Sequence, residues 1–180
     1  MKPFLKLLFV ILLAFGMFAC GEGEKKITQE DLKIAQASLF NQDQTLNDSV
    51  APEVAEKYCQ FVKQNPKDST AAMWLYHAME INVMLKNADK SIALGNQLVK
   101  QYPRTSWAPM SLFLLGSYVY NDQLNDTAQA HKTFQKLIDD YPNSPLVDDA
   151  EKSIEYLGLT PDEIMAKIMM SQFEEDEEDL

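Results

Sequence analysis

Apolar residues recur at helical spacing along most of the chain, and no segment alternates between apolar and polar residues as a half-buried strand does. The first predicted helix starts at the N-cap residue Thr28, with Asp31 completing a capping box, and its apolar face consists of Leu32, Ala35, Leu39 and Phe40. Residues 41–49 are polar and predict a loop. A second helix begins at Pro52, and its inward face consists of Val54, Ala55, Tyr58, Phe61 and Val62. The pattern predicts an all-α fold.

Three similar helix ends follow one another along the chain. A proline marks each of these helix ends. Pro66, Pro103 and Pro142 lie 37 and 39 residues apart. Superimposing the prolines aligns three apolar pairs, Phe61-Val62, Leu98-Val99 and Leu137-Ile138. After each proline comes a polar loop with an N-cap candidate, namely Asp68-Ser69, Thr105-Ser106 and Asn143-Ser144. A period of this size built from two helices predicts a helical array.

The clearest unit of this repeat carries Leu112, Leu115-Gly116, Tyr120, Ala130, Phe134, Leu137 and Pro142. It resembles the tetratricopeptide repeat, a helix hairpin of about 34 residues, with about two extra residues in the turn 121–127. The resemblance covers residues 50–158 and, more loosely, 28–49. It implies a short right-handed superhelix of about six to seven helices. A generic helical bundle is the alternative.

The family pattern also places small residues where the two helices of a unit cross. In the clearest unit these are Gly116 and Ala130. In the preceding unit Met79 is large at the position of Gly116, and we expect the facing Ser91 to accept it, since a volume trade preserves packing density. Gly95 departs from the family pattern, which usually has an aromatic residue there.

The array is predicted to end in a capping helix. Residues 143–157 form the last array helix, and Gly158 stops it. Thr160, Pro161 and Glu163 then start a helix over 161–173, whose apolar side carries Ile164, Ile168, Met169 and Phe173. The helical domain therefore spans 28–173. Six consecutive acids begin the segment 174–180, and their mutual repulsion predicts a disordered tail.

The N-terminal residues predict an export signal. Lys2 and Lys6 flank the start of an uncharged, mostly apolar run over 7–19, which has the length of a secretory signal core and is shorter than the roughly 20 residues of a membrane-spanning helix. The run ends in Met17-Phe18-Ala19-Cys20, which resembles the lipobox of bacterial lipoproteins. The resemblance implies removal of residues 1–19, attachment of fatty acids such as palmitate to Cys20, and a polar tether over 20–27. An uncleaved signal anchor and ordinary secretion with a spare Cys20 are the alternatives.

Composition narrows the possible functions. The 180 residues suit one domain, and 27 acids against 16 bases give a formal charge of −11, which excludes a nucleic-acid partner because phosphates need a clustered basic face. His77 and His131 have no acids or cysteines at ligand spacing, and Cys59 beside Tyr58 predicts a buried structural thiol. No phosphate loop or catalytic motif occurs. We therefore predict no catalytic residue, no metal and no cofactor.

The remaining candidate for function is a surface. In the tetratricopeptide family the first helix of each unit lines a concave groove. The resemblance implies a partner-binding groove formed by Met73, Tyr76, Glu80 and Val83 from one unit and by Met110, Phe113, Ser117 and Tyr120 from the next. The alternative is that the N-terminal helix or the helix over 161–173 covers these residues.

The two resemblances together imply a non-catalytic, lipid-anchored adaptor in the cell envelope. It would bind a protein or peptide partner and serve outer-membrane assembly or envelope maintenance, with its anchor in the outer membrane and its domain in the periplasm or on the cell surface. A self-associating, dimeric envelope lipoprotein is the alternative. An unrecognised envelope enzyme is a second alternative, for which we find no set of catalytic residues.

Overall fold

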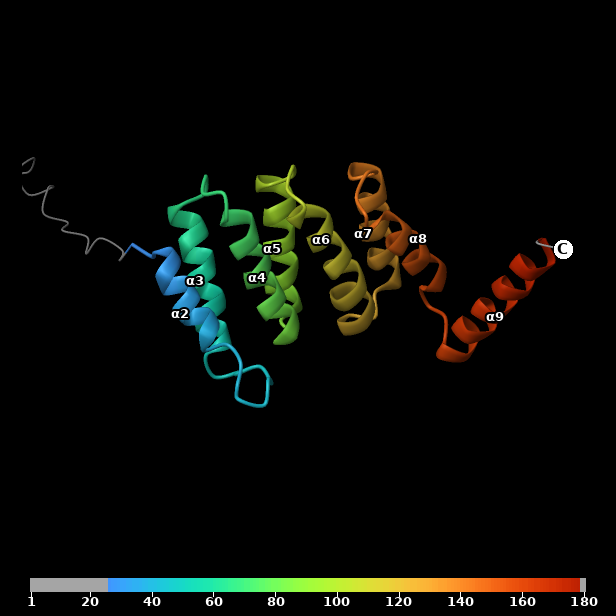
Figure 1. Cartoon of the computed structure of the whole chain (residues 1–180), viewed down its shortest axis with the longest axis horizontal. Coiled ribbons are helices and arrows are strands. Elements are labelled where there is room, and N and C mark those ends of the chain that lie inside the picture. The colour runs from blue at the N-terminus through green and yellow to red at the C-terminus, as the bar shows by residue number, and fades with distance from the viewer. Residues whose placement is uncertain (1–25, 179–180) are drawn as a thin grey trace, which may run out of the picture.

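The computed structural model describes residues 26–178, and the described backbone is all-helical apart from an isolated β-bridge between Phe40 and Leu46. Figure 1 shows the helices stacked side by side along the long axis of the molecule. The helices are α2 (Gln29–Ala37), α3 (Ala51–Gln64), α4 (Ala71–Met84), α5 (Ala88–Gln101), α6 (Trp107–Leu114), the π-helix η2 (Leu115–Gln123), α7 (Thr127–Asp140), α8 (Val147–Tyr156) and α9 (Pro161–Glu178). The all-α prediction and the array of helix hairpins are confirmed.

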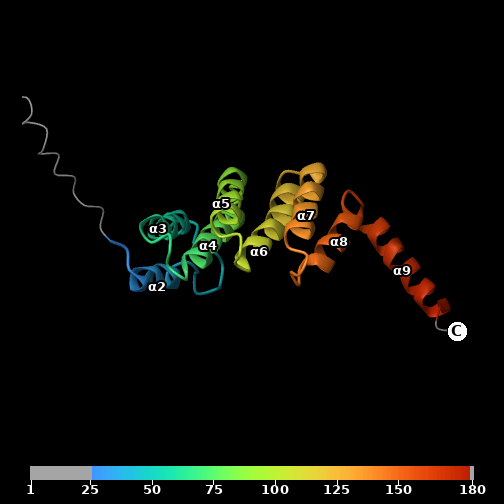
Figure 2. The ribbon, with the colours of Figure 1, turned by 90° about the horizontal axis from the view of Figure 1, so that it is seen from above.

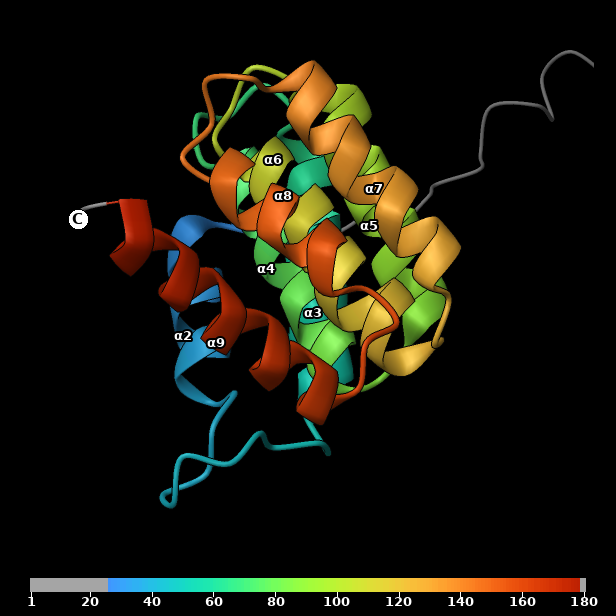
Figure 3. The same ribbon diagram turned by 90° about the vertical axis from the view of Figure 1, so that its right-hand side faces the viewer.

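The hairpins form two layers. Viewed along the array in Figure 3, α4, α6 and α8 overlap in one layer, and α5 and α7 overlap in the other. The first helix of each hairpin therefore lies in one layer and the second helix in the other, as in a repeat array.

The predicted helix ends are confirmed at all three prolines. Helices α3, α5 and α7 each end two residues before their proline. The next residue donates its backbone N–H to a carbonyl four residues earlier: Asn65 to Phe61, Tyr102 to Leu98, and Tyr141 to Leu137. The starts of the following helices agree with the predicted N-caps to different degrees: α6 has its N-cap at Ser106, as predicted, whereas α4 has it at Thr70, one residue after Ser69. Helix α8 starts at Val147 instead of residue 143, because the N–H of Ser144 bonds to Tyr141 and that of Val147 bonds to Ser144, which closes two successive turns first.

The predicted core positions are largely confirmed. Leu32, Ala35 and Leu39 and all five inward residues of α3 are buried. Phe40 is the exception, because 49% of its surface is exposed. Helix α2 ends at Ala37, so Phe40 lies in the following turn, where it pairs with Leu46 instead of continuing the helix face.

The two central hairpins are α4 with α5, and α6 and η2 with α7. They place their large and small residues in opposite order where their helices cross. A Cβ on Gly116 would lie 2.8 Å from Cε1 of Phe134, and a Cβ on Gly95 would lie 3.2 Å from Sδ of Met79 and 2.7 Å from Cδ1 of Leu115. The distances add two close partners to the volume trade that we predicted: Phe134 lies opposite Gly116, and Met79 lies opposite Gly95. Ala130 and Ser91, the partners that we predicted, are both fully buried. Gly95 lacks the usual aromatic ring because Met79 and Leu115 occupy that space.

Some of the extra residues between α6 and α7 lie in the π-helix η2 and not in the turn. The π-helix η2 continues α6 directly, and the N–H of Leu124 bonds to the carbonyl of Val119, five residues earlier, at 3.0 Å. A π-helix places more residues in each turn than an α-helix and occurs frequently at functional sites. The insertion that we expected in the turn 121–127 is therefore absorbed in part by η2, which rotates the side chains after Leu115 relative to an α-helical register.

Helix α9 starts where we predicted, and it projects from the end of the array. Both the N–H and the hydroxyl of Thr160 donate to Oε2 of Glu163 at 2.8 Å, as predicted for the capping box. Gly158, with a φ of +77°, turns the chain after α8, and α9 projects beyond α8 instead of lying across it (Figure 2). Lys167 reaches back to Glu155 at 3.6 Å and lies 5.6 Å from the ring centre of Tyr156. Helix α9 therefore does not cover the predicted groove residues, which was the alternative that we left open.

Helix α9 also differs in length and exposure from the prediction. It continues past residue 173 to Glu178, so much of the segment that we predict as a disordered tail is helical, which fits the high helix propensity of glutamate. Met165, Met169 and Met170 are exposed on it. None of the helices in the described range combines the length and the apolar character needed to cross a bilayer.

The buried hydroxyl of Tyr58 leads to the first expected result. Tyr58 is 1% exposed, its ring centre lies 4.8 Å from that of Trp74, and its hydroxyl has no hydrogen-bond partner among the described residues. An unpaired buried polar group costs about 1–3 kcal/mol. Because phenylalanine keeps the ring without the hydroxyl, we expect Tyr58→Phe to raise the free energy of unfolding at pH 7 by about 1 kcal/mol, measured by urea unfolding.

The same substitution should also change the response to alkaline pH. Burial raises the pKa of Tyr58 to about 12, against 10.0 for an ordinary tyrosine. The folded state therefore holds this proton more tightly, and the resulting stability is present below pH 10 and is lost as the pH rises towards 12. Tyr58→Phe should remove this component of the alkaline loss, whereas Tyr118→Phe, at an exposed tyrosine, should not. A decrease in stability at pH 7 for Tyr58→Phe would contradict the expectation.

Candidate functional site

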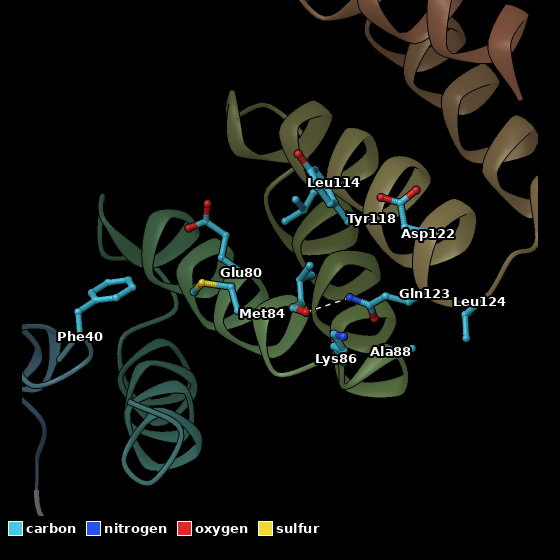
Figure 4. A pocket seen from close by; sticks show the side chains of 11 residues that line it. Phe40, Glu80, Met84, Lys86, Ala88, Leu114, Tyr118, Asp122, Gln123 and Leu124 are labelled. Carbon is cyan, nitrogen blue, oxygen red and sulfur yellow. Dashed lines mark hydrogen bonds between the residues drawn. The ribbon is translucent and has the colours of Figure 1, made fainter. Parts of the chain in front are cut away.

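The largest of three described hollows lies between α4 and the continuous helix formed by α6 and η2 (Figure 4). We call it the α4–η2 groove, and its volume is about 920 Å³. Both helices belong to the layer of first helices, which the family resemblance implied as the groove-forming layer. Its lining residues are Phe40, Glu80, Val83, Met84, Lys86, Ala88, Leu114, Tyr118, Asp122, Gln123 and Leu124.

Exposed apolar side chains gather in this groove. Phe40, Met84, Tyr118 and Leu124 are 45–52% exposed, and all four line it. The other large hydrophobic residues exposed in the described part of the chain are Ile34 and three methionines of α9. A contiguous exposed apolar patch is characteristic of a protein-interaction site, whereas single exposed apolar residues are ordinary. The groove is therefore the strongest candidate for a binding surface on the array.

The groove also carries more negative than positive charge. Its lining includes the carboxylates of Glu80 and Asp122 and one ammonium group, that of Lys86. The C-terminal ends of α4 and η2 both lie at it, since Val83, Met84, Asp122 and Gln123 are last-turn residues. The C-terminus of a helix has a negative partial charge. Together, the two carboxylates and the two helix C-termini give the groove a negative potential.

Gln123 makes a hydrogen bond at the same place. Its side-chain Nε2 donates to the carbonyl of Val83 at 2.9 Å, which ties the end of η2 to the end of α4 (Figure 4). Its Oε1 is buried and has no hydrogen-bond partner among the described residues. The hydrogen bond to Val83 therefore fixes the end of η2 beside the end of α4, and Oε1 itself is closed to an occupant of the groove.

Glu80 is held in place by its neighbours on α4. Nδ1 of His77 lies 2.7 Å from Oε2 of Glu80, and the hydroxyl of Tyr76 also hydrogen-bonds to this side chain. Our prediction that His77 has no acid at ligand spacing is therefore wrong, because Glu80 lies three residues later on the same helix face. Burial, the charge of Glu80 and this hydrogen bond all raise the pKa of Tyr76, so the tyrosine stays a neutral donor. The carboxylate of Glu80 is therefore oriented at the groove before any partner arrives.

The structure separates the residues that we predicted for one groove. Glu80 and Val83 line the α4–η2 groove, Ser117 lines a second hollow between η2 and α8, and Met110 lines a third hollow beside the turn after α7. Met73, Phe113 and Tyr120 are half-buried and line none of these three. The ring of Phe113 packs edge-to-face on Phe134, with centres 5.6 Å apart.

The expectation that Tyr76 is exposed is wrong. Only 6% of its surface is accessible, because Trp107 from the next hairpin packs on its ring with centres 5.1 Å apart. Tyr118 and Asp122 are groove residues that we did not predict. They continue the face of Leu114 at a spacing of four, and the sequence pattern alone did not distinguish this face from the neighbouring one that we predicted. Of the two segments that we considered as covers, the turn after α2 contributes Phe40 to the groove edge, and α9 projects away.

The candidate chemical groups outside the groove are separated from one another. His131 is exposed on α7, and Cys59 is a free, half-buried thiol whose pKa burial raises to about 11. In the part of the chain that the structure describes, no three side chains of the metal-ligating types come together. Cys20, the predicted lipid attachment site, and the predicted signal peptide over 1–19 lie outside the described residues.

A family comparison bears on the second central hairpin. Residues 110–144 match the family model described as tetratricopeptide repeat. The chain contains a tetratricopeptide repeat. The match covers most of α6, all of η2 and α7, and the turn after Pro142, which is the hairpin with the clearest sequence pattern. The array is therefore a tetratricopeptide-like helical superhelix.

This family constrains the kind of function. Tetratricopeptide repeats generally mediate protein–protein interaction and are typically non-catalytic. No curated protein matches the chain. The interaction role of the repeat agrees with the apolar groove, which lies against the same α6 and η2 helices that carry the match.

Proposed function

We propose that this protein is a non-catalytic adaptor that captures a protein partner in the α4–η2 groove while a lipid anchor holds it at the cell envelope. The observation that carries the proposal is the gathering of Phe40, Met84, Tyr118 and Leu124 in one groove of a tetratricopeptide array. Apolar residues grouped in this way are suited to burial against a partner segment.

The anchoring part of the proposal is supported by sequence alone. The run over 7–19 followed by Ala19-Cys20 resembles a lipoprotein signal, and several acyl chains on one cysteine give stable attachment, at about 0.8 kcal/mol for each buried CH₂ group. We place the anchor in the outer membrane, with the domain facing the periplasm, and the role in outer-membrane assembly or envelope maintenance. Confinement to a surface raises the effective concentration of a partner on the same membrane, so a modest affinity suffices.

One cell experiment tests both parts. A photo-crosslinking amino acid replaces Tyr118 in the groove, and in a control it replaces the exposed His131 on α7. We expect a specific protein crosslink from position 118 and none from position 131. In a Cys20→Ser background the chain should leave the membrane fraction and incorporate no labelled fatty acid. The crosslink should fall at least fivefold, because the effective concentration is lost.

The outcomes separate the two parts of the proposal. Cys59→Ser is the matched cysteine control, and it should leave both fractionation and lipid labelling unchanged. Fatty-acid label that persists in Cys20→Ser would contradict the anchor. Equal crosslinking from positions 118 and 131 would contradict capture in the groove.

Self-association is the second candidate function, and the exposed methionines of α9 favour it. These residues form an apolar surface on a helix that projects from the array (Figure 1). If two copies bind through the groove, the crosslink from position 118 should yield a dimer of this chain, with the attachment point in α9.

A further inference from the structure

We propose that the α4–η2 groove selects a basic, apolar segment of its partner, in which lysine or arginine residues alternate with large apolar side chains. This inference rests on the proposed function of the groove as the partner site and adds the chemistry of the segment that it accepts.

The apolar half of this specificity comes from side chains on both walls. Met84 lies at the end of α4, and Leu114 and Tyr118 lie on the facing helix. Figure 4 shows Met84 and Tyr118 on opposite sides of the hollow, with Phe40 at one end and Leu124 at the other. A segment with large apolar side chains would cover all four exposed residues and remove them from water.

The preference for lysine or arginine in the partner comes from the charges around the same hollow. Glu80 is oriented by His77 and Tyr76, and Asp122 lies one turn beyond Tyr118 on η2. The C-terminal ends of both helices add negative partial charge. A lysine or arginine of the partner would satisfy these acceptors, whereas a carboxylate there would meet like charge, which costs several kcal/mol in an interface.

The whole chain reinforces this preference. Its formal charge of −11 attracts a basic partner from a distance and speeds its association, an effect that added salt screens. The Debye length of about 8 Å at physiological salt means that the lining carboxylates, not the distant ones, set the affinity.

The same charges argue against helix α9 as the occupant. Its exposed methionines are apolar, but Asp162 and Glu163 lie in its first turn, and residues 174–179 are all acidic. Inserting α9 of the same or a second copy would bring these acids towards Glu80 and Asp122. We therefore assign the groove to a basic partner and treat α9 as a competitor to be measured.

Three labelled peptides test the assignment on the full chain held in nanodiscs of neutral lipid. The first is an amphipathic peptide of leucine and lysine, the second has glutamate in place of every lysine, and the third is residues 161–178 of this chain. Empty nanodiscs measure adsorption to lipid. We expect the lysine peptide to bind at least tenfold more tightly than either acidic peptide, and the difference to shrink between about 50 and about 500 mM salt.

Charge-neutral variants locate the preference. Glu80→Gln with Asp122→Asn keeps the shape of the groove and should lower affinity for the lysine peptide at least fivefold. Asp139→Asn with Glu151→Gln removes the same two charges from exposed positions on α7 and α8 and should change it less than twofold. Tyr118→Ser should weaken the lysine peptide through lost apolar contact. Circular dichroism confirms folding, and Asp122→Asn alone replaces any double variant that unfolds.

Each contrary outcome overturns the assignment in a recognisable way. Equal or tighter binding of the glutamate peptide shows that the groove does not select basic segments, although capture at position 118 in cells would still support the adaptor function. Tighter binding of the 161–178 peptide assigns the groove to α9. No binding of the lysine peptide up to about 1 mM, a binding free energy near −4 kcal/mol, or binding insensitive to Tyr118→Ser, removes the groove as the site of basic segments.

Discussion

Phe134→Ala should lower the free energy of unfolding by about 3–5 kcal/mol, the range measured when a buried aromatic ring is removed. Phe134 is 1% exposed, and its ring fills the space opposite Gly116 on the facing helix. Because Gly116 has no side chain, it cannot fill the cavity that the ring leaves, and the cavity can close only by a shift of neighbours such as Phe113. A loss of this size is a large fraction of the stability of a typical domain, about 5–15 kcal/mol.

A single tryptophan makes the location of this loss measurable. Trp74 lies in α4, in the hairpin before the cavity, whereas Trp107 begins α6 in the same hairpin as Phe134, so the measurement uses a Trp107→Phe background in which Trp74 is the reporter. In a repeat array each unit contacts its neighbours, so the C-terminal hairpin should unfold before the rest. In urea, circular dichroism should therefore show an earlier transition than tryptophan fluorescence. His131→Ala, an exposed position on α7, is the control, and a loss below about 1 kcal/mol for Phe134→Ala would contradict the expectation.

Gly95→Phe should destabilise the chain by about 3 kcal/mol or more, the upper end of the cost of overpacking. The substitution restores the aromatic residue that the family usually has at this position, and changes towards a family consensus commonly stabilise proteins. Here the opposite is expected. A Cβ alone on Gly95 would lie 2.7 Å from Leu115 and 3.2 Å from Met79, so a whole ring has no space.

Two further variants identify the cause of that loss. Met79→Ala combined with Gly95→Phe should recover part of the stability, because it vacates the space of the Met79 side chain, while Leu115 still obstructs the ring. Ala93→Phe, at an exposed position on the same helix, should stay within about 0.5 kcal/mol of the parent chain. The free energies come from urea unfolding. A stability of Gly95→Phe equal to that of the parent would show that the crossing is more adaptable than its close distances indicate.

The helix boundaries and the buried faces could be predicted because local chemistry decides them. A proline beyond the first turn cannot continue the backbone hydrogen bonds of a helix. Helices therefore end before Pro66, Pro103 and Pro142. The spacing of Tyr58, Phe61 and Val62 places them on one side of any helix, and all three are buried. The capping box of Thr160 and Glu163 is likewise a contact between residues three apart.

The errors arose where residues far apart in sequence determine the environment. Trp107 covers Tyr76 from the next hairpin, 31 positions along the chain, and the spacing within α4 contains no information about it. Gly95 faces Met79 and Leu115 because of the way two neighbouring helices approach, which the pattern of either helix alone does not specify. The direction of α9 depends on the turn at Gly158, which has a φ of +77°. A glycine in the sequence permits this angle but does not require it.

The candidate site could be predicted in part for the same reasons. The layer of first helices carries the largest described hollow, and Glu80 and Val83 line it, whereas the binding of a partner there stays a prediction. Tyr118 and Asp122 line the groove in place of the expected Ser117 and Tyr120. They continue, at a spacing of four, the face that Leu114 has at the end of α6, so the predicted face was already off by one residue at Phe113. A shift of one residue on a helix turns a side chain by about 100°, which is enough to change the residues of a surface.

The opposite placement of large and small residues in the two central hairpins limits how this protein can be rebuilt. A chimaera that joined α4 to α7 would set Met79 against Phe134, and one that joined α6 and η2 to α5 would leave two glycines, Gly95 and Gly116, facing an empty gap. Whole hairpins keep these internal matches when they are transplanted, and single helices do not. Gly95 also faces Leu115 of the next hairpin, whose Cδ1 would lie 2.7 Å from a Cβ on Gly95, so a cut after Pro103 separates a second matched contact. Engineers who shuffle or lengthen this array should therefore cut at the turn that follows Pro142 and keep the two central hairpins together.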